Sequence, residues 1–239
     1  MKAVLGLIML CSVCAYGQRR VDVDANMDVT LQPGAFFTSV NGIPAVTNIY
    51  YRVVDGTAFF RDEWLKGSVS IEKGREYQNL TLKLDLLENT LYFKDGKGNE
   101  MVCTTPVNGI SLKDPTQGKV FRFAHIKFIP ALAELKLNCW LEVLANGPVQ
   151  LYSQYKKTVS ESRPYGQATL EQRILTTNLY YLVIDNRMVK VKRIADIAKA
   201  LPSNQTEIQA WLKANNVEDK NPSDFARLVD WYNGLTAKN

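Results

Sequence analysis

Histidine is nearly absent from this chain of 239 residues, which contains only His125. One histidine excludes every site that needs two, so an HExxH zinc site or a two-histidine metal centre cannot be built. A Ser-His-Asp triad would also need a serine on a sharp turn, and no G-x-S-x-G sequence occurs. His125 lies in strand-like sequence, which favours a structural or surface role. We predict no metal ion and no cofactor.

Phosphate-binding glycine loops are missing as well. Neither GxxxxGK[ST] nor GxGxxG occurs, and the glycines at 96 and 98 lie in hairpin sequence rather than between a strand and a helix. With 46% hydrophobic and 22% charged residues, the composition excludes disordered, collagen-like and multi-pass membrane proteins. The charge balance, 29 Lys and Arg against 24 Asp and Glu, is only weakly basic and indicates no particular partner.

One short basic run precedes the C-terminal segment. It contains Arg187, Lys190, Lys192 and Arg193. Strand alternation puts the two lysines on one face, so a solvated sheet edge or face is the favoured interpretation. Contact with acidic glycans or lipid phosphates at a membrane surface is the alternative, and we expect no nucleic-acid partner.

The first residues have the pattern of a secretory signal peptide. Met1–Gly17 carries one charge at Lys2, an apolar run from Ala3 to Ala15, and a small-x-small ending before Gln18. The 13 residues of the apolar run are too few to span about 30 Å of hydrocarbon at about 1.5 Å per residue. We therefore predict cleavage near Gly17 and a secreted or periplasmic protein.

Two cysteines remain after that cleavage. Cys103 and Cys139 both lie in strand-like sequence. In an oxidising compartment they could form one disulfide, provided that the fold brings their Cα atoms within about 7 Å. Buried free thiols are the other interpretation, because cysteine packs like a small hydrophobic residue.

The region from Val29 to about Lys192 predicts a mainly β (α+β) protein. Its apolar residues alternate with period two, most clearly in Asn79–Leu86, and turn sequences such as Asp95-Gly96 interrupt the pattern. We expect an antiparallel meander that forms a barrel, half-barrel or sandwich. The predicted strands are Ile49–Val54, Gly67–Glu72, Asn79–Leu86, Leu91–Phe93, Glu100–Thr104, Gly109–Lys113, Lys119–Phe128, Leu135–Leu144, Val149–Lys156, Asn178–Ile184 and Met188–Lys192. The polar stretch Thr158–Gln167 is predicted to be an exposed loop.

After Lys192 the apolar period becomes helical. One helix is predicted around Ile194–Leu201 and ends at Pro202. Asn204 and Asn221 are predicted N-caps of two further helices. The predicted organisation is a signal peptide at 1–17, a mobile leader at 18–28, an antiparallel β domain at 29–192, and a C-terminal subdomain of three short helices at 193–239.

Two kinds of residue offer candidate functional chemistry. Carboxylates are one kind: Glu142 stands in a strongly apolar strand, and Asp85 lies near the end of the clearest strand, Asn79–Leu86. A carboxylate-dependent hydrolase acting on glycans or peptides would need two such acids across a cleft. Aromatic residues are the other kind, and strand alternation places some of them outside the main core. The candidate ligand or partner surface comprises Tyr50, Tyr51, Trp64, Tyr92, Tyr180 and Tyr181.

Several short segments together resemble a family of secreted proteins without assigned activity in the Bacteroidetes group of bacteria. They are residues 64–69, 77–80, 84–85, 140–144, 147, 151–152, 180–181 and 228–233. The resemblance implies a Gram-negative periplasmic or exported protein, and it carries over no catalytic residue. We therefore expect a non-catalytic envelope protein that binds an apolar ligand or a protein partner, with the hydrolase as the alternative.

Overall fold

A computed structural model describes residues 20–22, 42–45, 53–71, 75–133, 135, 137–163, 165 and 170–236. The strands are β1 (Arg20–Asp22), β2 (Gly42–Pro44), β3 (Val53–Asp55), β4 (Leu65–Ile71), β5 (Arg75–Asp85), β6 (Thr90–Lys94), β7 (Glu100–Cys103), β8 (Val107–Lys113), β9 (Val120–His125), β10 (Trp140–Ala145), β11 (Val149–Ser162), β12 (Glu171–Ile184) and β13 (Arg187–Val191). The helices are η2 (Ile126–Phe128), α2 (Pro130–Ala133), α3 (Ile194–Ala200), α4 (Gln205–Ala214) and α5 (Pro222–Thr236).

The protein is mainly β, as predicted, and its described strands form one open, mixed sheet. The strand order is β13-β12-β11-β10-β9-β8-β4-β5-β6-β7-β2, with β1 beside β5 and β3 beside β12. The order joins two meanders, β4–β7 and β8–β13, through the β4–β8 pair, so the prediction of a single meander is wrong. A closed barrel is also wrong, because β13 and β2 end the order without pairing with each other.

Two parallel pairs make the sheet mixed rather than antiparallel. β1 runs parallel to β5 and β3 runs parallel to β12. β1 lies within the segment predicted to be a mobile leader, and its three residues pair with Glu76, Tyr77 and Gln78 of β5. β3 reaches β12 because Gly56, with φ +80°, lies directly against the β12 backbone: a Cβ there would be 2.1 Å from the carbonyl oxygen of Ile174.

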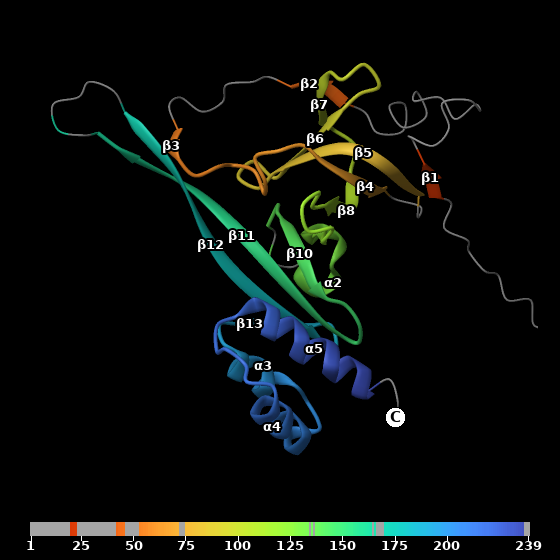
Figure 1. The fold of residues 1–239 in the computed structure, drawn as a ribbon, viewed down its shortest axis with the longest axis vertical. Coiled ribbons are helices and arrows are strands. Elements are labelled where there is room, and N and C mark those ends of the chain that lie inside the picture. Colours follow the sequence, from red (N-terminus) through yellow and green to blue (C-terminus); the bar gives the residue numbers. More distant parts are fainter. Residues whose placement is uncertain are drawn as a thin grey trace, which may run out of the picture.

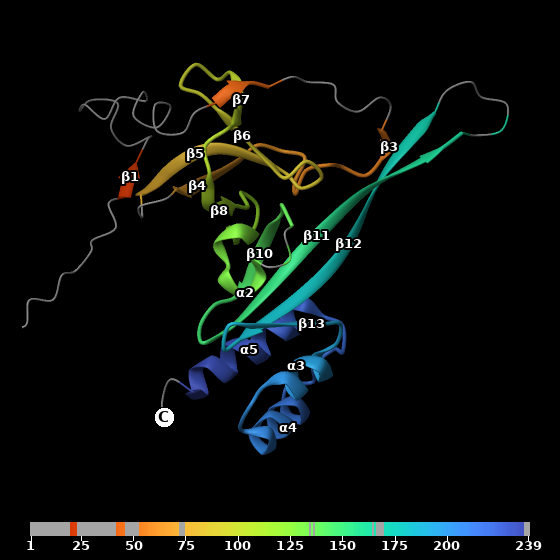
Figure 2. The same cartoon turned by 180° about the vertical axis from the view of Figure 1, so that it is seen from behind.

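The longest feature is the β11–β12 hairpin, which rises from the C-terminal helices towards β3 (Figures 1 and 2). Its ladder is continuous from the Val149–Ile184 pair to the Ser162–Glu171 pair. Residues 158–162 are therefore strand, and the predicted exposed loop over them is wrong. Their side chains are exposed, and all except Val159 are polar, because this part of the hairpin extends beyond the helices.

Helices cover both faces of the β11–β12 hairpin near its base. Leu151 and Leu182 point to one face and pack with Ile197 and Phe225 of the C-terminal helices. The neighbouring residues of both strands point the other way and pack against α2, which was not predicted. A third cluster gathers residues of β4, β5, β6, β8 and β9 with Trp140 at the start of β10.

The three helices predicted after Lys192 are present as α3, α4 and α5. Asn221 caps α5, since its Oδ1 accepts the backbone N–H of Ser223 at 2.9 Å. Asn204 precedes α4 in a left-handed conformation with φ 60° and makes no capping bond through its side chain. Among the described residues, no helix combines the length and apolar character needed to cross a membrane.

One side-chain amide fastens α5 to the sheet. Asn233 accepts the backbone N–H of Val149 at 2.9 Å and donates to the Val149 carbonyl at 2.8 Å. The amide thereby takes the place of a neighbouring strand beside Val149, at the start of β11, where the pairing with β10 has already ended. Gly147 leaves the necessary room, because a Cβ there would be 2.6 Å from the Asn233 Nδ2.

Candidate functional site

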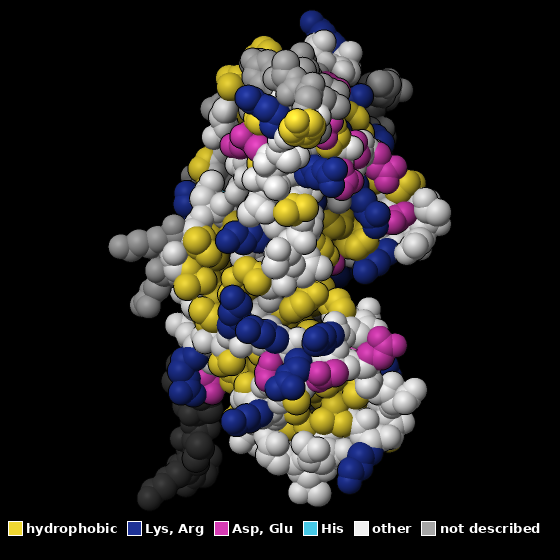
Figure 3. All heavy atoms as spheres, turned by 90° about the vertical axis from the view of Figure 1, so that its left-hand side faces the viewer, with side chains coloured by type: hydrophobic (Ala, Val, Ile, Leu, Met, Phe, Trp, Pro, Cys, Tyr) yellow, Lys and Arg dark blue, Asp and Glu magenta, His cyan; other side chains and the backbone are white. Residues whose placement is uncertain are grey.

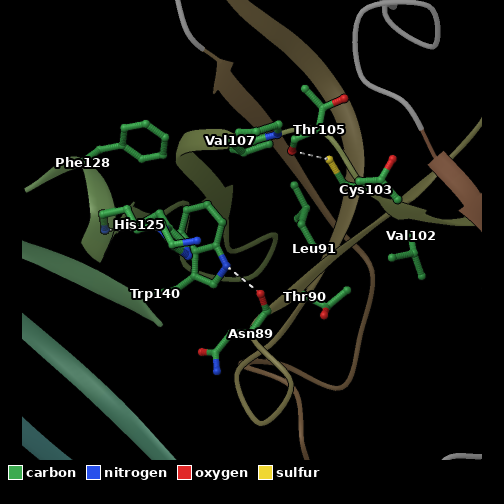
Figure 4. A pocket seen from close by; sticks show the side chains of 13 residues that line it. Asn89, Thr90, Leu91, Val102, Cys103, Thr105, Val107, His125, Phe128 and Trp140 are labelled. Carbon is green, nitrogen blue, oxygen red and sulfur yellow. Dashed lines mark hydrogen bonds between the residues drawn. The ribbon is translucent and has the colours of Figure 1, made fainter. Parts of the chain in front are cut away.

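A pocket of about 360 Å³ opens between the β6–β7 hairpin and the end of β9. The turn before β6, the loop from β7 to β8, the last two residues of η2 and the first residue of β10 complete its wall. In Figure 4, Trp140, His125 and Phe128 form one side, while Leu91 and Cys103 lie across from them. The lining residues are Asn89, Thr90, Leu91, Val102, Cys103, Thr104, Thr105, Pro106, Val107, His125, Lys127, Phe128 and Trp140.

Trp140 is held in place by the turn that precedes β6. Its indole N–H donates to the carbonyl of Asn89 at 3.3 Å. Asn89 has φ 57°, a left-handed conformation that asparagine tolerates better than most residues. The same turn is capped by Asp85, whose Oδ1 accepts the backbone N–H groups of Leu87 and Glu88, both at 2.8 Å. Asp85 therefore shapes the wall of the pocket indirectly.

His125 is fixed from both ring nitrogens. The backbone N–H of Lys127 donates to Nδ1 at 3.4 Å, so the proton lies on Nε2, which donates to Asn138 Oδ1 at 3.1 Å. Burial lowers the pKa of His125, partly offset by the Asn138 bond. The ring packs edge-on against Trp140, with centroids 4.9 Å apart. His125 is thus fixed within the pocket wall, and burial favours its neutral form.

Both cysteines of the described chain are free thiols, so the disulfide alternative is not realised in the structure. Cys103 packs against the cluster formed by β4, β5, β6, β8 and β9 with Trp140, whereas Cys139 is buried in the cluster between α2 and the β11–β12 hairpin. The Cys103 thiol donates to the Thr105 carbonyl at 3.5 Å. Burial raises the pKa of each thiol to about 11. Neither is therefore a thiolate nucleophile near neutral pH.

The aromatic residues predicted to form a ligand or partner surface lie in separate places. Trp64 is half-buried, and the Lys94 ammonium lies 4.9 Å from its ring centroid. Tyr92 packs edge-on against Phe59 at 5.9 Å. Tyr50 and Tyr51 lie outside the described residues. None of the described members lines the Trp140 pocket.

Tyr180 and Tyr181 occupy opposite faces of β12, as strand alternation predicts. Tyr180 packs edge-on against Phe225 of α5, with ring centroids 5.3 Å apart. Tyr181 is buried and donates its hydroxyl to Gln154 Oε1 at 3.0 Å. These two rings anchor the helices and the hairpin rather than a common surface.

The two candidate acids are also separated in their roles. Glu142 is buried in β10, accepts the hydroxyl of Tyr155, and has its pKa raised by burial. Burial likewise raises the pKa of Asp85, opposed by its two backbone hydrogen bonds. Both side chains are less than 5% exposed. Within the described ranges, no group of three His, Cys, Asp or Glu side chains is placed to hold a metal ion.

No protein-family model, curated protein or solved structure matches this chain. The pocket itself is the feature that sequence reasoning missed. Its walls come from segments up to 51 residues apart in the sequence, such as the turn and the strand that the bond between Asn89 and Trp140 joins. The nearest available signal was Trp140, a large aromatic residue beside Glu142 in an otherwise aliphatic strand.

Proposed function

We propose that this protein is a non-catalytic, secreted or periplasmic binding protein whose pocket beside Trp140 holds a small, largely apolar ligand. The single observation that supports this most strongly is the pocket itself. Its volume of about 360 Å³ falls in the range of small-molecule sites. Leu91, Val107, Phe128 and Trp140 supply apolar and aromatic walls, while threonines and Lys127 stand at the rim.

The chemistry of the polar lining favours binding over catalysis. His125 uses both ring nitrogens inside the fold, and the Cys103 thiol is protonated near neutral pH because of its raised pKa. The hydrolase alternative is disfavoured, because Asp85 and Glu142 are both buried and hydrogen-bonded within the fold. We take the open sheet to be a half-barrel, since one face of β4–β6, β8 and β9 packs into a single cluster.

Phe128 supplies the most specific test of the pocket. It is 39% exposed and packs edge-on against His125, so replacing it by alanine removes part of the wall without a large core cavity. Leu175, 51% exposed on the β11–β12 hairpin, provides a matched control. We would purify wild type, Phe128→Ala and Leu175→Ala gently from the native host and record native mass spectra.

We expect wild type and Leu175→Ala to carry a discrete bound mass, and we expect this mass to disappear on denaturation. Occupancy should fall at least several-fold in Phe128→Ala. Equal occupancy in all three proteins would place the ligand elsewhere and refute this site. No bound mass on any of them, together with no chemical-shift change at the Trp140 indole on adding indole or naphthalene, would overturn the proposal. The predicted location is tested separately: mass spectrometry of the periplasmic fraction should detect the mature chain beginning at Gln18.

A further inference from the structure

The outer edge of β13 is a free strand edge. β13 is the last strand of the sheet order, and its described partner is β12 alone. The connecting turn has two residues, Asp185 and Asn186, with φ 48° and 58°. A two-residue turn makes Ile184 and Arg187 a hydrogen-bonded pair, and the pairs then alternate along the ladder. The N–H and C=O groups of Met188 and Lys190 therefore face away from β12.

A groove of about 760 Å³ lies along this edge, with α3 as its other wall. Ile197 and Leu201 fix that wall because they are buried in the core shared by the C-terminal helices. The groove is lined by Ile184, Asp185, Arg187, Met188, Val189, Lys190, Lys192, Asp196, Lys199, Ala200 and Pro202. A strand edge facing a helix across a groove is the geometry that accepts an extended peptide as an added strand.

The charges of the groove are unbalanced. Four cationic side chains line it against two carboxylates, and both carboxylates are already engaged. A carboxylate oxygen of Asp185 lies 4.0 Å from a guanidinium nitrogen of Arg187. Asp196 accepts the backbone N–H groups of Lys192 and Arg193 just before α3. Lys190 and Lys199 form no ion pair with any described side chain. Figure 3 shows Lys and Arg side chains gathered at the level of β13 and α3, with hydrophobic surface between them.

We propose that an extended, acidic peptide segment of another protein binds here by adding a strand to β13. Its backbone pairs with Met188 and Lys190, its carboxylates face the lysines, and its alternate apolar side chains contact Val189 and Pro202. A second copy of β13 does not fit the same edge, because pairing two such strands would bring like charges together. The lysines thus select a partner with negative charge, while the backbone of that partner stays free to pair with β13.

The test uses the full protein and a fluorescent peptide of alternating Glu and Val, acetylated and amidated at its ends. Fluorescence anisotropy should detect binding, and a Lys-Val peptide should not bind. Lys190→Glu should weaken binding by about tenfold or more, whereas the same charge change at exposed Lys213 on α4 should not. Phe128→Ala should leave peptide binding unchanged, which keeps this site distinct from the Trp140 pocket.

The strand addition itself is tested by two backbone changes. Met188→Pro removes an outward N–H while sparing the ladder to β12, so it should weaken binding about tenfold relative to Met188→Ala. Should the proline variant fail to fold, a peptide N-methylated at alternate residues provides the same test on wild type. Bound peptide should also slow hydrogen exchange at Met188 and Lys190.

Three results would overturn the proposal. The first is equal binding of the Glu-Val and Lys-Val peptides. The second is equal loss in Lys190→Glu and Lys213→Glu. The third is a combination: Lys190→Glu weakens binding, neither Met188→Pro nor N-methylation of the peptide changes it, and heparin displaces the peptide completely. That last outcome would describe a site for any polyanion rather than for a peptide strand.

Discussion

Replacing Asn233 by alanine tests the fastening of α5 to the sheet. The substitution removes both hydrogen bonds between the Asn233 amide and the Val149 backbone. Val149 and Asn233 are both buried, so the N–H and C=O of Val149 would be left without partners away from water. Each unsatisfied buried group costs about 1–3 kcal/mol, and we expect a total loss of about 3 kcal/mol. For a protein of this size that lowers Tm by roughly 6–12 °C.

Aspartate at the same position gives a sharper test. It keeps the acceptor for the Val149 N–H but places a carboxylate oxygen against the Val149 carbonyl, where Nδ2 now donates at 2.8 Å. Two acceptors repel, so the protonated acid is favoured in the folded state and its folded pKa lies above the ordinary value of about 3.9. The folded state then binds the proton at a higher pH than the unfolded state. The stability deficit relative to wild type should therefore shrink as the pH falls through that raised pKa.

Urea unfolding followed by far-ultraviolet circular dichroism and by tryptophan fluorescence would measure these changes. Asn146→Ala is the control, because Asn146 is exposed in the neighbouring loop and should change stability by less than about 0.5 kcal/mol. A loss below about 1 kcal/mol for Asn233→Ala would refute the reasoning. So would an Asn233→Asp deficit that stays constant between neutral pH and about pH 4.

Four further predictions concern other contacts. Cys103 and Cys139 should resist a thiol reagent at pH 7.5 in the native protein, because burial raises both pKa values to about 11. Both should react once the chain is unfolded without reductant, because both are free thiols. An unfolded chain that takes up no label and has a mass two protons below that of the dithiol form would contradict this. Gly67→Ala should destabilise the protein by roughly 2 kcal/mol or more in thermal unfolding, because a Cβ there would lie 2.1 Å from a carbonyl oxygen of β8; Gly98→Ala, in open space but with φ +85°, is the comparison for backbone strain alone. Tyr155→Phe should cost about 1–3 kcal/mol at neutral pH by removing the hydroxyl donor to buried Glu142. Burial raises the pKa of Glu142, so the folded state binds its proton at a higher pH than the unfolded state does. The free energy of unfolding of the wild type should therefore rise as the pH falls through that raised pKa, and this rise should be missing in Glu142→Gln.

Much of the local structure was predictable because it depends on neighbours in the sequence. Alternating apolar residues and the Asp95-Gly96 turn predicted β5, β6 and the hairpin between β6 and β7. In that hairpin Asp95 accepts backbone N–H groups of Lys97 and Asn99, both at 2.8 Å, within the turn. The helical period after Lys192 predicted α3, α4 and α5 for the same reason, since a helix buries residues three and four apart. The predicted secretory signal at Met1–Gly17 and the family resemblance stay predictions.

What sequence reasoning could not supply depends on pairings between distant segments. The β4–β8 pair, the parallel strands β1 and β3, and the extended β11–β12 hairpin all follow from three-dimensional neighbours that no local pattern encodes. The pocket is of the same kind: Trp140 gains its position from the Asn89 carbonyl, 51 residues earlier. Local periodicity and turn chemistry determined the elements of this protein, whereas long-range backbone pairing and side-chain burial decided which of them meet, and with them the pocket and the free edge of β13.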